Sequence, residues 1–305
     1  MNLAIIAGQG GLPPHLVRVL RARGEVPLIC EIDQFPSDVT DIVPRLRFRF
    51  ENLGTFLKVL QEAGVSRLCM AGAVRRPAVD PSLIDKETLP LVPRVMAAMA
   101  KGDDGTLRVF IGLFEELGLS VVGAAEIDPD LLPPAGRLGD IDVPEGLEND
   151  LKAAETALDQ MGEADLGQSV VVRDARVLAR EGEAGTDAML GGLAPGAKPA
   201  ADDPLDAVGD VLGSVADWLS GPEAEAARQQ APGAGGILYK APKPGQELRV
   251  DMPAIGPETV RRAAQAGLRG LVIEEGGVMV LDREAVCQCL TDHALFLWVR
   301  PRSGT

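Results

Sequence analysis

Short apolar runs alternate with longer segments of helical spacing along the first ~125 residues. Four runs predict buried strands: Leu3–Ala7, Val26–Glu31, Arg67–Ala71 and Leu119–Val122. The spacing between them predicts helices: one opened by Pro13-Pro14 and ending near Gly24, one capped by Asn52 and running to Gly64, and Gly105–Leu117. Strands separated by helices favour a mostly parallel sheet with helices on its faces.

The pattern changes after the Leu-Pro-Pro-Ala-Gly stretch at 132–136, which interrupts both periodicities. Two hairpins are expected: Ser169–Val172 with Arg176–Ala179, and Gly270–Ile273 with Val278–Leu281. Further elements are strands at Gly236–Ala241 and Glu247–Asp251, a helix from Pro257 to Gly267 and a last helix from about Arg283. We therefore predict an α/β protein. A Rossmann-like N-terminal nucleotide- or phosphate-binding domain (1–132) and a linker (133–139) would precede a mixed α+β catalytic domain (140–305).

Residues 191–235 are rich in Ala, Gly, Pro and Asp and are expected to be an insertion. Within them, Leu205, Leu212 and Leu219 belong to a series with helical spacing. A helix lying on a membrane is one interpretation. Asp206 and neighbouring acids would then face anionic lipid, so a surface insertion with one packed helix is favoured.

The charge balance narrows the classes of partner. The chain has 30 basic and 45 acidic side chains, which gives a formal net charge of −15. This charge disfavours nucleic acid, and an aromatic content of 3% offers few stacking platforms for bases. No signal segment and no apolar run of ~20 residues is found, so a cytoplasmic protein is expected. The four cysteines fit reduced core thiols, and the presence of only two histidines in the sequence disfavours zinc chemistry.

The first loop, Gly8-Gln9-Gly10-Gly11, follows a strand and precedes a helix. Glycines there allow backbone amides to approach a phosphate, so Gly8, Gly10 and Gly11 are candidate substrate-binding residues. A nicotinamide dinucleotide site is an alternative, with Glu31 near the position of a ribose-binding acid. The G-x-G-x-x-G pattern, however, requires glycine where Pro13 stands. A tight turn without a ligand is the third interpretation.

Two more loops follow the predicted strands of the N-terminal half. Arg75 comes after the Arg67–Ala71 strand, at the sheet edge where ligands bind, and is a candidate for a phosphate or a uracil; a solvated charge is the alternative. Asp103 and Asp104 precede a helix and are candidates for metal or sugar hydroxyls, although either can serve as a helix cap.

The segment from Lys240 to Gly256 contains the most informative pattern. Three cations, Lys240, Lys243 and Arg249, occur with the carboxylate of Asp251 among three prolines and two glycines. Strand alternation would place Arg249 and Asp251 on one face. Stiff backbone and mixed charge suit a phosphate site in which the acid anchors Mg²⁺; a salt-bridged surface hairpin is the alternative.

A second candidate region lies before this segment. Thr186 and Asp187 follow the first predicted hairpin and open a helix, where either residue can cap the helix or face a ligand.

These segments together resemble the LpxI family of UDP-2,3-diacylglucosamine pyrophosphatases. The matching motifs occur in family order over nearly the whole chain: IAGQGGLP (6–13), AGAVRRP (71–77), GDDGTL (102–107), GQSVVV (167–172), GTDAM (185–189), KAPKPGQ (240–246), RVD (249–251), AGLRG (266–270) and LDRE (281–284). The chain departs from the family at Ala184, where a Glu is usual, and in the length of the segment after Met189.

The resemblance implies a cytoplasmic, Mg²⁺-dependent enzyme of lipid A biosynthesis that cleaves a lipid-linked UDP-sugar to UMP and 2,3-diacylglucosamine 1-phosphate. It also implies a homodimer, and a lipid substrate is compatible with contact at the inner face of the membrane. The family's essential acid maps onto Asp251, with Asp187 as a second candidate metal ligand. The substrate-site candidates from the C-terminal motifs are Thr186, Asp187, Lys240, Lys243, Gln246 and Arg249. Two other classes stay open: a non-catalytic sugar-nucleotide sensor and an NAD(P)-dependent oxidoreductase.

Overall fold

The chain forms two compact units, and each is described by itself. The computed structural model describes residues 2–74, 78–99, 103–164, 166–195 and 228–301. The first unit consists of Met1–Leu132 together with Gly245–Met252, and the second of Pro133–Pro244 and Pro253–Thr305. Part of the lysine–proline segment therefore belongs with the N-terminal half of the chain.

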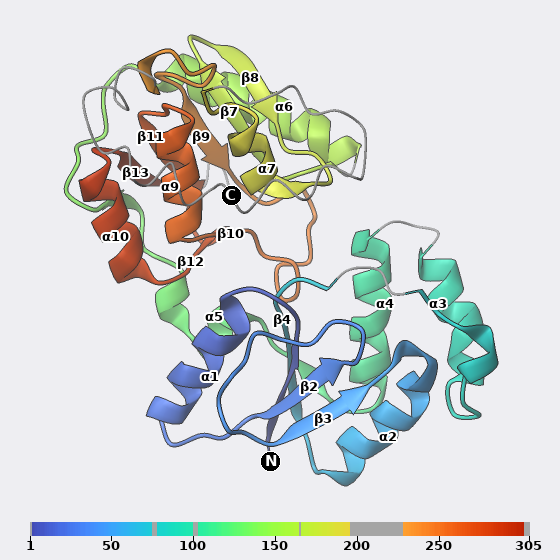
Figure 1. Ribbon diagram of the computed structural model, residues 1–305. Helices are drawn as coiled ribbons and strands as arrows, with labels where there is room; N and C mark the ends of the chain where they lie inside the picture. Colours follow the sequence, from blue (N-terminus) through green and yellow to red (C-terminus); the bar gives the residue numbers. More distant parts are fainter. Residues whose placement is uncertain (1, 75–77, 100–102, 165, 196–227, 302–305) are drawn as a thin grey trace. The chain divides into compact units, whose positions relative to one another are not determined.

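The first unit is built on a parallel sheet of five strands in the order β3-β2-β1-β4-β5 (Figure 1). The strands are β1 (Leu3–Ala7), β2 (Leu28–Ile32), β3 (Arg45–Phe48), β4 (Arg67–Ala71) and β5 (Ser120–Val121). The chain proceeds outward from β1 to β3 and then returns to the other side of β1 with β4. The carboxyl ends of β1 and β4 thus form a topological switch point, where open α/β sheets bind their ligands.

Helices cover both faces of this sheet. As a result, β1, β2 and β4 are buried almost throughout. On one face, α2 (Leu53–Glu62) and α4 (Asp103–Glu116) bury a core with Phe56 and Phe114, beside α3 (Val92–Met99). On the other, α1 (Leu12–Ala22) buries Leu16 and Leu20 and contacts α5 (Ala124–Ile127). Short 3₁₀ segments, η1 to η4, lie at Phe50–Asn52, Pro81–Leu83, Leu89–Leu91 and Pro129–Leu131.

The second unit contains a mixed sheet of six strands in the order β6-β13-β11-β9-β7-β8. These are β6 (Gly136–Leu138), β7 (Ser169–Arg173), β8 (Arg176–Arg180), β9 (Ile237–Lys240), β11 (Gly270–Glu274) and β13 (Phe296–Arg300). The three central strands β13, β11 and β9 are parallel, and the outer strands are antiparallel to their neighbours. Two short strands, β10 (Ala254–Ile255) and β12 (Met279–Val280), pair separately.

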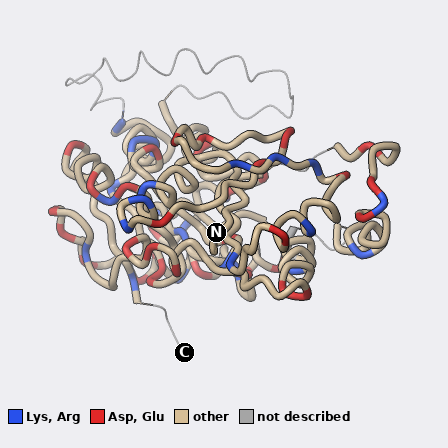
Figure 2. Tube along the Cα trace, turned by 90° about the horizontal axis from the view of Figure 1, so that it is seen from below, with Lys and Arg blue, Asp and Glu red and all other residues tan. Residues whose placement is uncertain are grey.

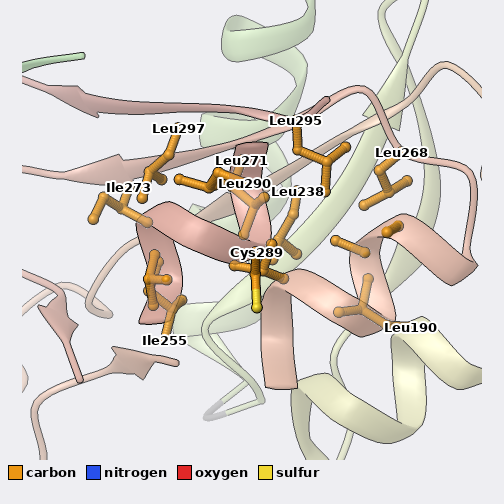
Figure 3. Close-up of a cluster of buried hydrophobic side chains, with 14 of the residues drawn as sticks. Leu190, Leu238, Ile255, Leu268, Leu271, Ile273, Cys289, Leu290, Leu295 and Leu297 are labelled. Atoms are coloured by element: carbon orange, nitrogen blue, oxygen red, sulfur yellow. The ribbon is translucent and has the colours of Figure 1, made fainter. Parts of the chain in front are cut away.

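Helices also cover both faces of the mixed sheet. On one face, α7 (Gly185–Gly191), α9 (Pro257–Gln265) and α10 (Arg283–Asp292) cover an apolar cluster that includes Leu190, Leu238 and Leu271 (Figure 3). On the other, α6 (Glu148–Glu163) packs against side chains such as Val272. Each fully buried side chain of this size contributes about 1.5–3 kcal/mol to folding. The predicted fold class, a parallel α/β region followed by a mixed region, is confirmed.

Figure 2 shows acidic and basic residues interspersed along the described parts of the chain, so the excess of acids is not confined to one segment. Within these parts, no helix has the length and apolar character needed to cross a membrane.

The hairpin predicted for Gly270–Ile273 and Val278–Leu281 is wrong. Both β11 and β12 exist, but β12 pairs in parallel with β10. Strand β11 already has β9 and β13 as neighbours, so it has no open edge for β12. The other predicted hairpin, β7 with β8, is confirmed.

The strand predicted at Glu247–Asp251 is also wrong. The amides of Val250 and Asp251 both donate to the carbonyl oxygen of Glu247, at 3.2 and 3.0 Å, so the chain makes a turn. Local bonds from Arg249 to the Glu247 carboxylate favour this compact form over an extended one. The argument that alternation places Arg249 and Asp251 on one face therefore loses its basis.

Asn52 occupies the position before α2 but makes no capping bond there. Its side-chain amide instead donates to the Asp85 carboxylate at 3.3 Å. Strands β3, β6 and β13 and helices α3 and α6 were not predicted. The helix predicted from Leu205 to Leu219 lies outside the described residues.

Candidate functional site

The glycine loop after β1 is closed by its own backbone bonds. The amides of Gly8 and Gln9 donate to the carbonyl oxygens of Ala71 and Ala73, at 2.8 and 2.9 Å. The amide of Gly10 donates to the Asp38 carboxylate at 2.6 Å. A carboxylate oxygen thus occupies a position that an anion-binding loop would offer to a phosphate.

Two prolines further limit this loop as an anion site. Pro13 and Pro14 fall in the first turn of α1, where proline carries no N–H to donate. Within the described chain, this leaves the amides of Gly11 and Leu12 as the remaining donors at the start of the helix. Gly8 lies against the backbone of Gly72 and Ala73, where a side chain would overlap, so its role is close packing at the switch point.

Glu31, the acid considered for a ribose, is held by other protein groups. It is 2% exposed, and its carboxylate accepts hydrogen bonds from Ser37 and Arg45, both at 2.6 Å. Arg47 lies 3.6 Å away. These contacts, together with Pro13, weaken the case for a nicotinamide site.

Three further candidates from the N-terminal half lie outside the described part of the structure, either entirely or with their side chains. Arg75 lies outside the described residues. Helix α4 begins at Asp103, two residues before the predicted start, and the side chains of Asp103 and Asp104 also lie outside the described part.

The segment Gly245–Met252 packs on the first unit near the carboxyl end of β5. Val250 contacts the core beneath α2 and α4. Arg108 of α4 donates to the carbonyl oxygen of Gly245 at 2.5 Å. Gly123, which follows β5, lies so close to the backbone of Arg249 that an added Cβ would be 3.3 Å from its Cα. The predicted catalytic segment is thus anchored at the carboxyl edge of the parallel sheet, the edge at which open α/β sheets generally bind ligands.

Asp251 is oriented by Gln246 within this segment. The Gln246 side-chain amide donates to both the Oδ2 atom and the main-chain oxygen of Asp251, each at 2.6 Å. Both side chains are half-buried. This two-point contact fixes the direction of the carboxylate, and it brings together two residues that the sequence assigned to one site.

Arg249 is held by two acids rather than by Asp251. Its guanidinium donates to Glu247 through Nε and Nη2, both at 2.9 Å, and to Glu115 of α4 at 2.8 Å. Hydrogen bonds donated to these acids raise the pKa of Arg249 above its usual range, and the same pairing lowers the pKa of Glu247. A phosphate bound to Arg249 would compete with these carboxylates for the charge of the guanidinium.

The lysines of the segment lie in the second unit. Lys240 ends β9 and is 7% exposed, and its Nζ donates to the Thr186 hydroxyl of α7 at 2.8 Å. Burial lowers the pKa of Lys240, and the charges of Glu181 and Asp187 partly offset this effect. Lys243 is half-buried, beside a proline that packs on Gly162 of α6. Thr186 and Lys240, predicted from separate motifs, are therefore in direct contact.

The two predicted metal ligands belong to different units: Asp251 to the first and Asp187 to the second. Asp187 is about half exposed and lies 3.7 Å from Arg262 of α9. In the described residues, no three acids, histidines or cysteines form a metal-binding cluster. Mg²⁺ is commonly held by one or two carboxylates together with substrate phosphates, and a single carboxylate such as that of Asp251 is compatible with this mode.

Comparison with known proteins identifies the family. The model of the LpxI N-terminal domain matches residues 2–131, and that of the LpxI C-terminal domain matches residues 134–204 and 214–298. The chain belongs to the LpxI family. It is 36% identical over 297 residues to the UDP-2,3-diacylglucosamine pyrophosphatase LpxI of Caulobacter vibrioides. The aligned residues make up 97% of this chain and 96% of that protein.

Membership of the LpxI family confirms the resemblance inferred from the motifs. The relative's name is that of an enzyme that cleaves a pyrophosphate, in agreement with the predicted class of hydrolase. The residues that the C-terminal domain model omits, 205–213, lie inside the segment expected to be an insertion.

Sequence reasoning missed three residues next to the candidate site. Glu181 accepts a hydrogen bond from the Thr186 hydroxyl, the Ser169 hydroxyl oxygen lies 3.1 Å from that of Thr186, and Glu247 accepts hydrogen bonds from Arg249. Ser169 lies in one of the family-like motifs and Glu247 directly follows another, but no spacing rule indicated their partners. Glu181 follows the predicted β8, and only the antiparallel return of the hairpin brings it beside Ser169.

Proposed function

We propose that this protein hydrolyses the pyrophosphate bond of UDP-2,3-diacylglucosamine with Mg²⁺, giving UMP and 2,3-diacylglucosamine 1-phosphate. Water adds to one phosphorus, the bridging P–O bond breaks, and each product keeps one phosphate. The observation that carries this proposal is the match of both LpxI domains over nearly the whole chain, with a pyrophosphatase as the named relative.

The structure supports a role for Asp251 at the reacting phosphates. Its carboxylate is held in one direction by Gln246, in a turn beside the carboxyl end of β5. We assign Asp251 as the carboxylate that holds Mg²⁺. When bound, the ion neutralises charge on the phosphate oxygens and orients them for attack. Gln246 is assigned to keep the carboxylate in place, so that little reorganisation is needed during the reaction.

The cations of the segment are assigned to the phosphates. Lys240 is pre-oriented by its bond to Thr186, and burial in a region of low dielectric strengthens its interaction with an anion. Arg249 is assigned the same task, in exchange for part of its pairing with Glu115 and Glu247.

An exposed apolar stripe on the first unit is assigned to the lipid part of the substrate. Leu89 and Met96 are 57% and 62% exposed, and their spacing of seven residues along η3 and α3 places them on one helical face, with exposed Pro93 between. Because it is 62% exposed, Met96 is not part of the buried core of the first unit. Replacing Leu89 and Met96 by serine is expected to raise KM for the diacylated substrate; an unchanged KM would remove this assignment.

The homodimer and the cytoplasmic location, with contact at the inner membrane face, are further parts of the proposal. They are supported by family resemblance alone. Sedimentation equilibrium at micromolar concentration tests the first, and fractionation of cells tests the second. A monomer, or recovery in the periplasm, would contradict them.

The direct test is release of UMP from purified protein incubated with UDP-2,3-diacylglucosamine. We expect turnover with Mg²⁺, loss of turnover with EDTA and recovery when Mg²⁺ is added in excess. Binding without UMP release would favour the sugar-nucleotide sensor, and a change in nicotinamide absorbance would favour the oxidoreductase. Reaction in H₂¹⁸O then shows which phosphorus is attacked, because only that product gains the label.

A further inference from the structure

Four polar side chains lie in contact beside the first turn of α7, and three of them are buried. Ser169, Thr186 and Lys240 are 0%, 8% and 7% exposed. The fourth is Glu181. Its carboxylate accepts hydrogen bonds from the Ser169 hydroxyl at 2.5 Å, the Thr186 hydroxyl at 3.0 Å and the main-chain N–H of Gln168 at 3.0 Å. We call these four residues the Glu181 cluster.

The available hydrogens define the direction of these bonds. Each hydroxyl has one hydrogen, and both hydroxyls of the cluster donate to Glu181. The Thr186 oxygen is then an acceptor for Lys240 at 2.8 Å. A directed chain therefore runs from the ammonium of Lys240, through the Thr186 hydroxyl, to the Glu181 carboxylate. Such chains strengthen each bond by polarisation.

The backbone is built around this carboxylate. Ser169 of β7 lies directly opposite Lys240 of β9 in the sheet register. Gly167 packs so closely on Glu181 that a Cβ at position 167 would overlap it. Gly185, which opens α7, has φ +85°, a conformation that L side chains rarely adopt. The cluster therefore fixes both the end of β9 and the first turn of α7.

A buried lysine is not explained by stability alone. Burial of an ammonium is costly, and an apolar side chain at position 240 would extend the surrounding core at no such cost. The charge of Lys240 is retained next to Thr186 and Asp187, the residues assigned to the substrate.

We propose that Glu181 is a positioning residue of the pyrophosphatase site, which orients the Thr186 hydroxyl and, through it, the ammonium of Lys240. Glu181 itself does not touch the substrate in this account. The inference rests on the proposed function, and it adds Glu181 and Ser169 to the residues on which turnover depends.

The test is Glu181→Gln, which keeps size but replaces one acceptor oxygen by an NH₂ group that must face a donor. We expect kcat to fall about 10- to 100-fold, which is the usual effect of losing a residue that orients a group in contact with the reacting atoms. KM should change by less than about threefold. Exposed Glu183 lies two residues away, and Glu183→Gln is the matched control that should leave both constants unchanged.

A double-mutant cycle separates positioning from loss of folded protein. If Glu181 acts through Lys240, Glu181→Gln should cause little further loss of kcat in a Lys240→Met background. An equal loss in both backgrounds would mean that Glu181 only supports the fold, and it would overturn the inference.

Hydrogen–deuterium exchange gives a readout that does not need activity. In Glu181→Gln, amides of the first turn of α7 should exchange faster, while those of α2 in the first unit stay unchanged. Unaltered exchange at α7 would also overturn the inference. If wild-type protein releases no UMP, the proposed function fails, and the exchange result still decides whether Glu181 orders this turn.

Discussion

Lys240 carries its charge at a cost to folding. Burial is the main cause that lowers its pKa, so the unfolded chain binds the proton more tightly than the folded protein. The resulting loss of stability is fully present below the folded-state pKa. It disappears as the pH rises above the unfolded value of about 10.4. At neutral pH, the positive charge of this side chain therefore lowers the stability of the folded protein relative to the neutral form, and the proposed role in the site depends on that charge.

Lys240→Met separates these two effects. Because Glu181 keeps its bonds from Gln168, Ser169 and Thr186, the variant should unfold at the same temperature as wild type or a higher one at pH 7. Any gain in unfolding temperature over wild type should become smaller as the pH is raised toward about 11. Turnover should fall about 10²–10³-fold, as for removal of a donor to a developing charge. Thermal unfolding measures the stability of the variant, and UMP release measures its turnover. A marked loss of stability with normal turnover would contradict the account.

At the scale of single residues, motif and chemistry indicated Lys240, Thr186, Gln246 and Asp251. The structure pairs Lys240 with Thr186 and Gln246 with Asp251. It does not bring together Arg249 and Asp251 through strand alternation, because the turn at Glu247 replaces the strand. Alternation applies only within an extended backbone, so an error in the element removes the inference about its side chains.

At the scale of elements, the spacing of apolar residues was sufficient to predict a helix or strand where the segment had one apolar face or was buried throughout. Strands β1 and β4 and helix α2 were predicted on this basis. The pairing of β12 with β10 was not, because pairing depends on which edges are already occupied. Helix α6 was missed, although Leu151, Ala154 and Leu158 show helical spacing, because alanines carry much of its buried face.

Helix α2 depends on a close approach that sequence alone does not show. Gly54 lies so near the backbone of Glu87 and Thr88 that a Cβ would overlap it, whereas Gly112 of α4 faces only the flexible end of Arg94, at 3.0 Å. We expect Gly54→Ala to lower the free energy of unfolding by about 1–3 kcal/mol. Gly112→Ala should be neutral or stabilise by up to about 1 kcal/mol through helix propensity. Urea denaturation of both variants checks this; equal effects would contradict it.

At the scale of the whole molecule, the order of elements along the chain predicted the fold class but not every segment's location. The segment Gly245–Met252 lies between the two parts of the second unit in sequence, yet it belongs to the first unit. Its attachment depends on Val250 in the core of the first unit and on Arg108 and Glu115 of α4. Such contacts, more than a hundred residues apart, have no signature in local periodicity.

The central claim is that Asp251 acts on the bound phosphates. Asp251→Ala should bind UDP-2,3-diacylglucosamine within a few-fold of wild type, because most of the contacts with substrate are kept. Its kcat should fall by about 10³ or more, since an interaction made in the transition state is lost. Asp159→Ala, at an exposed position of α6, is the control.

The most direct measurement is single-turnover release of UMP by Asp251→Ala with saturating enzyme and Mg²⁺. The account predicts bound substrate that is not cleaved on the timescale of the wild-type reaction. Cleavage by the variant within about threefold of the wild-type rate would contradict it.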